Sequence, residues 1–115
     1  GPRWGSARPQ APGMEVTFEL PAGTMLTALE YDRGSYRHDY PREFVIEFED
    51  GAGRRETLLA SRLAWEGARY LLEERGLLTF LFTPRVVHRV RMKQLGSDPI
   101  FDWSIPEVTF RGILP

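Results

Sequence analysis

Strict alternation of apolar and polar residues constrains the fold of this chain more than any other feature. In the segment 14–20, MEVTFEL, every second residue is apolar, and glutamates and a threonine lie between them. The segments 44–49 (FVIEFE) and 86–93 (VVHRVRMK) follow the same spacing. Because successive side chains of a β-strand point to opposite faces, this spacing predicts strands with one buried and one polar face.

Three more apolar runs, 24–31, 77–84 and 105–113, add candidate strands, with turn signals such as DGAG at 50–53 between some of them. Short strands separated by turns predict an all-β fold, a sandwich or a barrel. The segment 61–76, SRLAWEGARYLLEERG, leaves two alternatives open. It forms a helix with Ser61 and Gly76 as its caps, or a strand and loop, because Gly67 interrupts the helical pattern.

Composition excludes several classes of protein. The 115 residues carry 15 basic and 16 acidic side chains, a formal net charge of −1. This balance creates no field that would attract nucleic acid or an anionic membrane, and no stretch approaches the roughly 20 apolar residues that a membrane span needs. The chain has no cysteine and therefore no disulfide or thiolate metal site. We expect one domain, 1–115, with an irregular N-terminal segment, 1–13, that contains Trp4.

Sequence motifs of catalysis are missing from the chain. It has no Gly-x-Ser-x-Gly elbow, no His-Glu-x-x-His zinc helix and no glycine-rich phosphate loop. Most acidic residues alternate with apolar ones, so we expect them on the outward faces of strands. We therefore predict a domain that is not an enzyme and has no catalytic residues.

The segment 31–42, YDRGSYRHDYPR, gathers rings and charges immediately before a predicted strand. Sugar recognition uses a flat ring against the pyranose and polar groups that bind its hydroxyls. A polar corner at the start of the strand explains Asp39, Tyr40 and Pro41 as well. Trp65 is a ligand platform if exposed and a core residue if buried, and the loop 97–102 adds further candidates. The predicted ligand-binding residues are Arg33, Tyr36, Arg37, His38, Asp39, Trp65, Asp98 and Phe101.

A basic stripe occupies the alternate positions 89, 91 and 93. Nucleic acid binding would need a wider positive surface than the net charge provides. Strand spacing instead predicts that the stripe is a solvated strand face, paired with Glu47 and Glu49 on another strand.

Three stretches resemble the discoidin family, the coagulation factor V/VIII C-type domains: RWGSARPQAPGMEVTFEL (3–20), DYPREFVIEFEDG (39–51) and HRVRMKQLGSDPIFDWSIPEVTF (88–110). The resemblance implies an antiparallel β-sandwich or distorted jelly-roll barrel of the galactose-binding-like type, in which Trp4 is a fold residue. It also implies binding of carbohydrate, phospholipid or protein through loops at one end.

The chain also departs from the family pattern. The strand and Asp-Gly loop that precede the Trp in the family, and often hold a structural calcium, have no counterpart before Trp4. The expected fold therefore lacks the first family strand. Glu107 matches a signature Glu that helps to ligate the metal in the family, but oxygen ligands are not grouped around it in the sequence. We expect no metal and no cofactor.

Together these features predict a non-catalytic, carbohydrate-binding module. The resemblance implies that it is appended to a larger bacterial cell-envelope or secreted protein, such as a carbohydrate-active enzyme, and that it is extracytoplasmic. Its partners would be a glycan and domains of the parent protein, with no nucleic acid and no direct membrane insertion. The alternative is a protein–protein interaction domain that packs on its parent protein.

Overall fold

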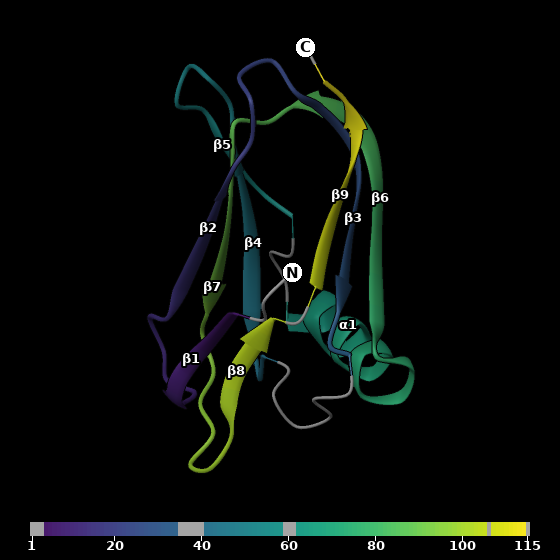
Figure 1. Ribbon diagram of the computed structural model, residues 1–115. Coiled ribbons are helices and arrows are strands. Elements are labelled where there is room, and N and C mark those ends of the chain that lie inside the picture. Colours follow the sequence, from purple (N-terminus) through teal and green to yellow (C-terminus); the bar gives the residue numbers. More distant parts are fainter. Residues whose placement is uncertain (1–3, 35–40, 59–61, 106, 115) are drawn as a thin grey trace.

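Two antiparallel β-sheets face each other in the computed structural model, which describes residues 4–34, 41–58, 62–105 and 107–114 (Figure 1). One sheet has four strands and the other has three. A separate two-stranded pair and one helix lie at one end of the sheets (Figure 1). The prediction of a β-sandwich is confirmed at this level, and the jelly-roll topology stays a prediction.

The four-stranded sheet confirms the alternating pattern. Its register places Met92 between Val16 and Ile46, and these three side chains are buried or half-buried. The neighbouring positions carry the charged residues, which point to the other face. In order, the sheet contains β2 (Glu15–Glu19), β7 (Arg89–Gln94), β4 (Phe44–Glu49) and β5 (Arg55–Thr57).

The three-stranded sheet closes the other side of the core. Tyr31 is fully buried on its inner face, where its hydroxyl oxygen lies 3.0 Å from the indole Nε1 of Trp103, which donates to it. Both rings therefore pack inside the molecule, with their polar atoms paired to each other. In order, this sheet contains β6 (Leu77–Val86), β3 (Met25–Asp32) and β9 (Glu107–Ile113).

The N-terminal segment is not irregular throughout, which corrects the prediction for residues 1–13. Residues 4–9 form β1 (Trp4–Pro9), which pairs antiparallel with β8 (Asp102–Ile105). The pairing is hard to predict from sequence because its register shifts between Gly5 and Pro9, and Ala7 has a positive φ of 59° within that interval. A short, irregular pair of this kind leaves no alternating pattern.

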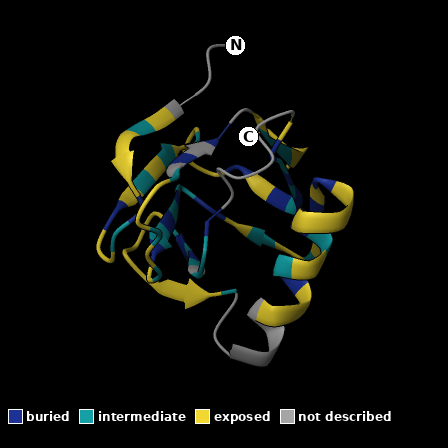
Figure 2. Ribbon diagram, turned by 90° about the horizontal axis from the view of Figure 1, so that it is seen from below, coloured by how far each residue is buried: buried dark blue, intermediate teal, exposed yellow. Residues whose placement is uncertain are grey.

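Of the two alternatives for the segment 61–76, a helix or a strand and loop, the structure shows the helix, α1 (Arg62–Arg75). Ala68 and Leu72, four residues apart, are buried, and Figure 2 shows the exposed residues along the side of the helix that faces away from the sheets. The helix is followed by Gly76, with φ of 74°, as expected for its C-cap. Among the described residues, no helix is long and apolar enough to cross a membrane.

Candidate functional site

The centre of the predicted binding loop lies outside the described residues. Tyr36, Arg37, His38 and Asp39 belong to 35–40, so their roles stay predictions. Trp65 lies on α1, and its side chain is outside the described part as well. The structure places the remaining three predicted residues, all of them near the same end of the sheets.

Arg33 holds the helix rather than an open binding surface. Its side chain is buried, with 8 % of the residue exposed, and its Nε donates to the carbonyl oxygen of Leu72 at 2.6 Å. Its two terminal nitrogens donate to the carbonyls of Gly34 at 3.0 Å and Glu73 at 3.3 Å. These carbonyls include groups that a helix leaves unpaired in its last turn. We therefore do not keep Arg33 in the proposed ligand set.

Asp98 and Phe101 come together in a loop corner with Arg42. Asp98 accepts hydrogen bonds from the backbone N–H groups of Phe101 and Ile100, both at 2.8 Å, and from Nε of Arg42 at 3.0 Å. These bonds, chiefly the backbone ones, lower the pKa of Asp98 below its ordinary value. The guanidinium carbon of Arg42 lies 5.8 Å from the centre of the Phe101 ring. Both members of the Arg42–Asp98 pair are mostly buried, which favours a structural role.

Two buried glutamines beneath this corner were missed by sequence reasoning. Gln94 is fully buried, and its Nε2 donates to Oε1 of Gln10 at 2.5 Å. Oε1 of Gln94 accepts from the backbone N–H groups of Glu43 at 3.1 Å and Gly96 at 3.0 Å. The sequence did contain a signal, because Gln94 follows Met92 by two positions and therefore continues an inward face.

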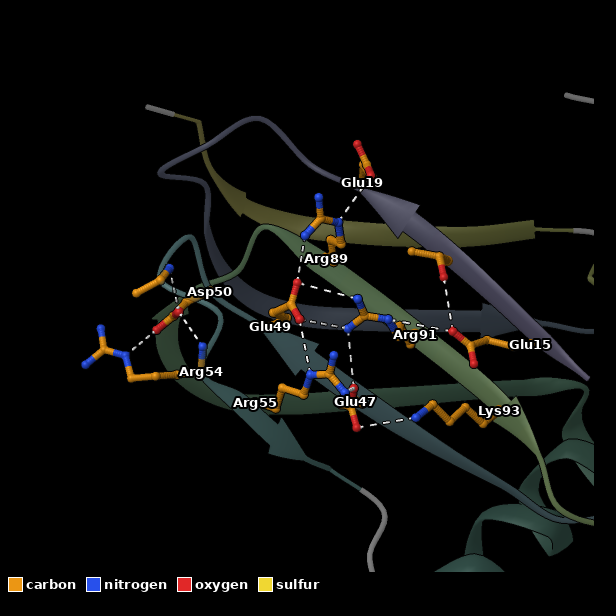
Figure 3. Close-up of polar contacts among 12 residues, drawn as sticks. Glu15, Glu19, Glu47, Glu49, Asp50, Arg54, Arg55, Arg89, Arg91 and Lys93 are labelled. Atoms are coloured by element: carbon orange, nitrogen blue, oxygen red, sulfur yellow. Dashed lines mark hydrogen bonds and ion pairs between the residues drawn. The ribbon is translucent and has the colours of Figure 1, made fainter. Parts of the chain in front are cut away.

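The basic stripe pairs with Glu47 and Glu49, as predicted, but Glu49 is buried, with 5 % of the residue exposed, so this face is not solvated throughout (Figure 3). The register causes this, because Arg89 lies opposite Glu49 and Arg91 lies opposite Glu47 on β4. Arg89 reaches Glu49 at 2.8 Å, Arg91 reaches it at 3.2 Å, and Arg55 of β5 reaches it at 3.2 Å. Hydrogen bonds from Arg89, then from Arg91, lower the pKa of Glu49 from 4.5 to about 2.

Replacing Glu49 by glutamine should flatten the acid dependence of stability. Because the folded-state pKa of Glu49 is about 2, its contribution is complete above the ordinary value of 4.5 and is lost as pH falls from 4.5 to about 2. We expect the wild-type unfolding temperature to fall across this window more steeply than that of Glu49→Gln. Glu74→Gln, a change at an exposed position of α1, serves as the control. Parallel curves for wild type and Glu49→Gln would contradict this assignment.

A cleft of about 300 Å³ opens at the other end of the sheets. It lies where β5, the edge of one sheet, faces the end of β6, an edge of the other. Polar groups from both edges share this space with the buried ring of Phe48. Its lining residues are Phe48, Asp50, Arg54, Arg55, Glu56, Arg85 and Val86.

The turn between β4 and β5 fixes one wall of the cleft. Oδ1 of Asp50 accepts from the backbone N–H groups of Ala52 at 2.9 Å and Arg54 at 3.0 Å, while Oδ2 accepts from Nε of Arg54 at 2.8 Å. These bonds lower the pKa of Asp50, with the backbone N–H of Arg54 as the largest cause. The turn also uses the positive φ of 82° at Gly53. The wall is therefore formed before any ligand arrives.

Arg85 fixes the opposite wall of the cleft. It pairs with Glu56 of β5, and its Nε donates to the carbonyl of Thr83 at 2.9 Å. Its guanidinium carbon lies 5.4 Å from the centre of the Phe82 ring, and that ring lies 5.1 Å from the ring of Phe48. The guanidinium is thus held between a carboxylate and an aromatic face.

Chemically, the cleft can bind but shows no catalytic arrangement among the described residues. Its carboxylates, Asp50 and Glu56, are ion-paired with arginines, and the pKa of Asp50 is lowered rather than raised. A general acid needs a carboxyl group whose pKa is raised towards neutral pH. Among the described residues, no group of three or more His, Asp or Glu side chains could hold a metal ion.

No protein-family model matches the chain, and no curated protein or solved structure is significantly similar to it. The resemblance to the discoidin family therefore stays a prediction from the three stretches of sequence that suggest it.

Proposed function

We propose that this protein is a non-catalytic ligand-binding module whose ligand is a carbohydrate. The cleft between β5 and β6 carries the proposal. Ligand pockets begin at about 300 Å³ and combine an apolar lining with a few well-placed polar groups. Here Val86, which is 44 % exposed, supplies apolar surface, and guanidinium donors stand beside carboxylate acceptors. Sugars need both kinds of partner, because each hydroxyl both donates and accepts hydrogen bonds.

The rigid fold supports binding without further ordering. The turn 50–53 and the Arg85–Glu56 pair hold the two walls in place, so little conformational entropy is lost when a ligand binds. Two or three hydrogen bonds to charged groups, each contributing about 1.5–3 kcal/mol, correspond to affinities of roughly mM to μM. Such affinities suit a module that holds a larger protein on a polymer.

Arg85→Met should weaken glycan binding about 10- to 100-fold, because it removes a charged donor and keeps most of the apolar stem. Binding of the wild type is first found on a glycan array and then measured by titration calorimetry. Arg111→Met is the matched control, because Arg111 is also ion-paired across strands, with Glu30, but lies on β9, at the other edge of its sheet from β6, and does not line the cleft. Equal glycan affinities of Arg85→Met and Arg111→Met would show that the cleft does not bind the glycan.

The sequence-predicted loop makes a competing prediction in the same assay. Tyr36→Ala or Arg37→Ala would abolish binding and leave the melting temperature nearly unchanged if the loop 31–42 holds the glycan. The loop follows Asp32, and the cleft contains Val86, which pairs with Met25 at the opposite end of β3. Seven residue steps of a strand separate these ends by about 23 Å. Loss of binding in the loop variants alone would show that the glycan binds at the loop 31–42 and not in the cleft, and carbohydrate binding would remain the proposed function.

One observation favours the alternative of a protein-interaction domain. On the three-stranded sheet, Met25 pairs with both Val86 and Ile113, which puts three apolar side chains in one row. They are 37 %, 44 % and 67 % exposed, and Leu81, five residues before Val86 on β6, is 81 % exposed. Exposed apolar side chains gathered in one row are typical of protein interfaces. If the wild type binds no glycan, this row becomes the proposed contact with the parent protein.

A further inference from the structure

The guanidinium groups that line the cleft are already ion-paired within the protein. Arg54 pairs with Asp50 at 2.8 Å, and Arg85 pairs with Glu56. Arg55 pairs at 3.2 Å with Glu49, a carboxylate below the cleft that it shares with Arg89 and Arg91. Each guanidinium group of the cleft therefore has a carboxylate partner before a ligand binds.

An anionic ligand gains little from such a surface. To reach a guanidinium group, it must approach the carboxylate that already occupies that group, and like charges at close range are unfavourable. Protonation does not remove this repulsion near neutral pH. The pKa of Glu49 is about 2, and the pKa of Asp50 is also below its ordinary value.

A neutral polyol meets no such conflict. One hydroxyl can accept a hydrogen bond from a guanidinium N–H while its neighbour donates to the paired carboxylate, so the ion pair stays intact. The pairs offer donor and acceptor side by side, as at Arg54 and Asp50, whose atoms lie 2.8 Å apart. We infer that the cleft selects neutral glycans with adjacent hydroxyl groups over glycans that carry carboxylate or sulfate groups. This inference rests on the proposed function.

The first test compares oligosaccharides of equal length with neutral sugars or uronic acids by calorimetry at low and high NaCl. Neutral oligosaccharides should bind at least about tenfold tighter, and their Kd should change less than about twofold with salt, because no net charge is neutralised. Tighter binding of the uronic-acid series, weakened by salt, would overturn the inference and leave carbohydrate binding in place. Binding of neither series would overturn both the proposed function and the inference.

The second test changes the charge of the cleft by one unit. In Glu56→Gln, Arg85 loses its carboxylate partner. The affinity for the uronic-acid oligosaccharide should therefore rise roughly tenfold relative to the affinity for the neutral oligosaccharide. Glu56 is 53 % exposed in its side chain on an edge strand, and the variant should fold. Glu74→Gln on α1 makes the same charge change away from the cleft and should alter neither affinity. An unchanged preference in Glu56→Gln would contradict the inference.

Discussion

Arg33→Met should lower the free energy of unfolding by about 3 kcal/mol. The substitution removes the donors that Arg33 supplies to the carbonyls of Gly34, Leu72 and Glu73, and the buried Leu72 carbonyl then keeps the N–H of Gly76, at 3.1 Å. Hydrogen bonds from charged groups contribute about 1.5–3 kcal/mol each, but the exposed carbonyls can bind water instead. Methionine keeps the stem of the side chain, so the loss reports the hydrogen bonds rather than a cavity. Urea unfolding followed by circular dichroism measures it.

Arg75→Met is the matched control for this change. Arg75 lies in the last turn of the same helix but is exposed, so we expect a loss below about 0.5 kcal/mol. The experiment also separates the two roles considered for Arg33. Unchanged stability together with lost glycan binding would contradict helix capping and return Arg33 to the ligand set.

Gln94→Leu should also cost about 3 kcal/mol of unfolding free energy. The apolar side chain nearly matches glutamine in size, but it removes the acceptor of the Glu43 backbone N–H and leaves the N–H of Gly96 with only the carbonyl of Glu43, at 3.2 Å. Each buried group left without a partner costs about 1–3 kcal/mol. Gln10 also loses the donor Nε2 of Gln94. The loss would loosen the loop corner around Arg42.

Met92→Leu controls for packing at the same site. Met92 is fully buried on β7, two residues before Gln94, and a change of this kind usually costs less than about 1.5 kcal/mol. Both variants are unfolded in urea under the same conditions. A loss in Gln94→Leu no larger than that in Met92→Leu would show that the glutamine network contributes little.

Local patterns predicted the parts of this fold in which one face of a strand is buried. The alternation in 14–20 and 44–49 became β2 and β4, and the spacing of Arg89 and Arg91 correctly predicted their pairing with glutamates. Both follow from the two-residue period of a strand, which needs no knowledge of distant contacts. The sequence leaves both a helix and a strand possible for 61–76, because Gly67 interrupts the helical spacing of apolar residues and Leu71–Leu72 is equally compatible with a strand.

The candidate site depends on contacts that no local pattern contains. The cleft joins the turn after β4 to Arg85, about thirty residues later, and it exists only because the edges of two sheets meet there. The sequence predicts Arg33 as a ligand residue because a polar loop indicates no partner for its side chain. Two of its three carbonyl partners, Leu72 and Glu73, lie about forty residues away, at the end of α1. Sequence spacing alone cannot distinguish such an arginine from one that binds a ligand.

The central claim, that a glycan binds between β5 and β6, is tested most directly by nuclear magnetic resonance. A ¹⁵N-labelled sample is titrated with a neutral oligosaccharide that binds on the array, and the backbone amide shifts are followed. We predict saturable shifts concentrated in residues 50–56 and 85–86, which contain most of the residues that line the cleft. Saturable shifts confined to residues 31–42, or to the row of Met25, Val86 and Ile113 without the turn 50–53, would contradict the claim.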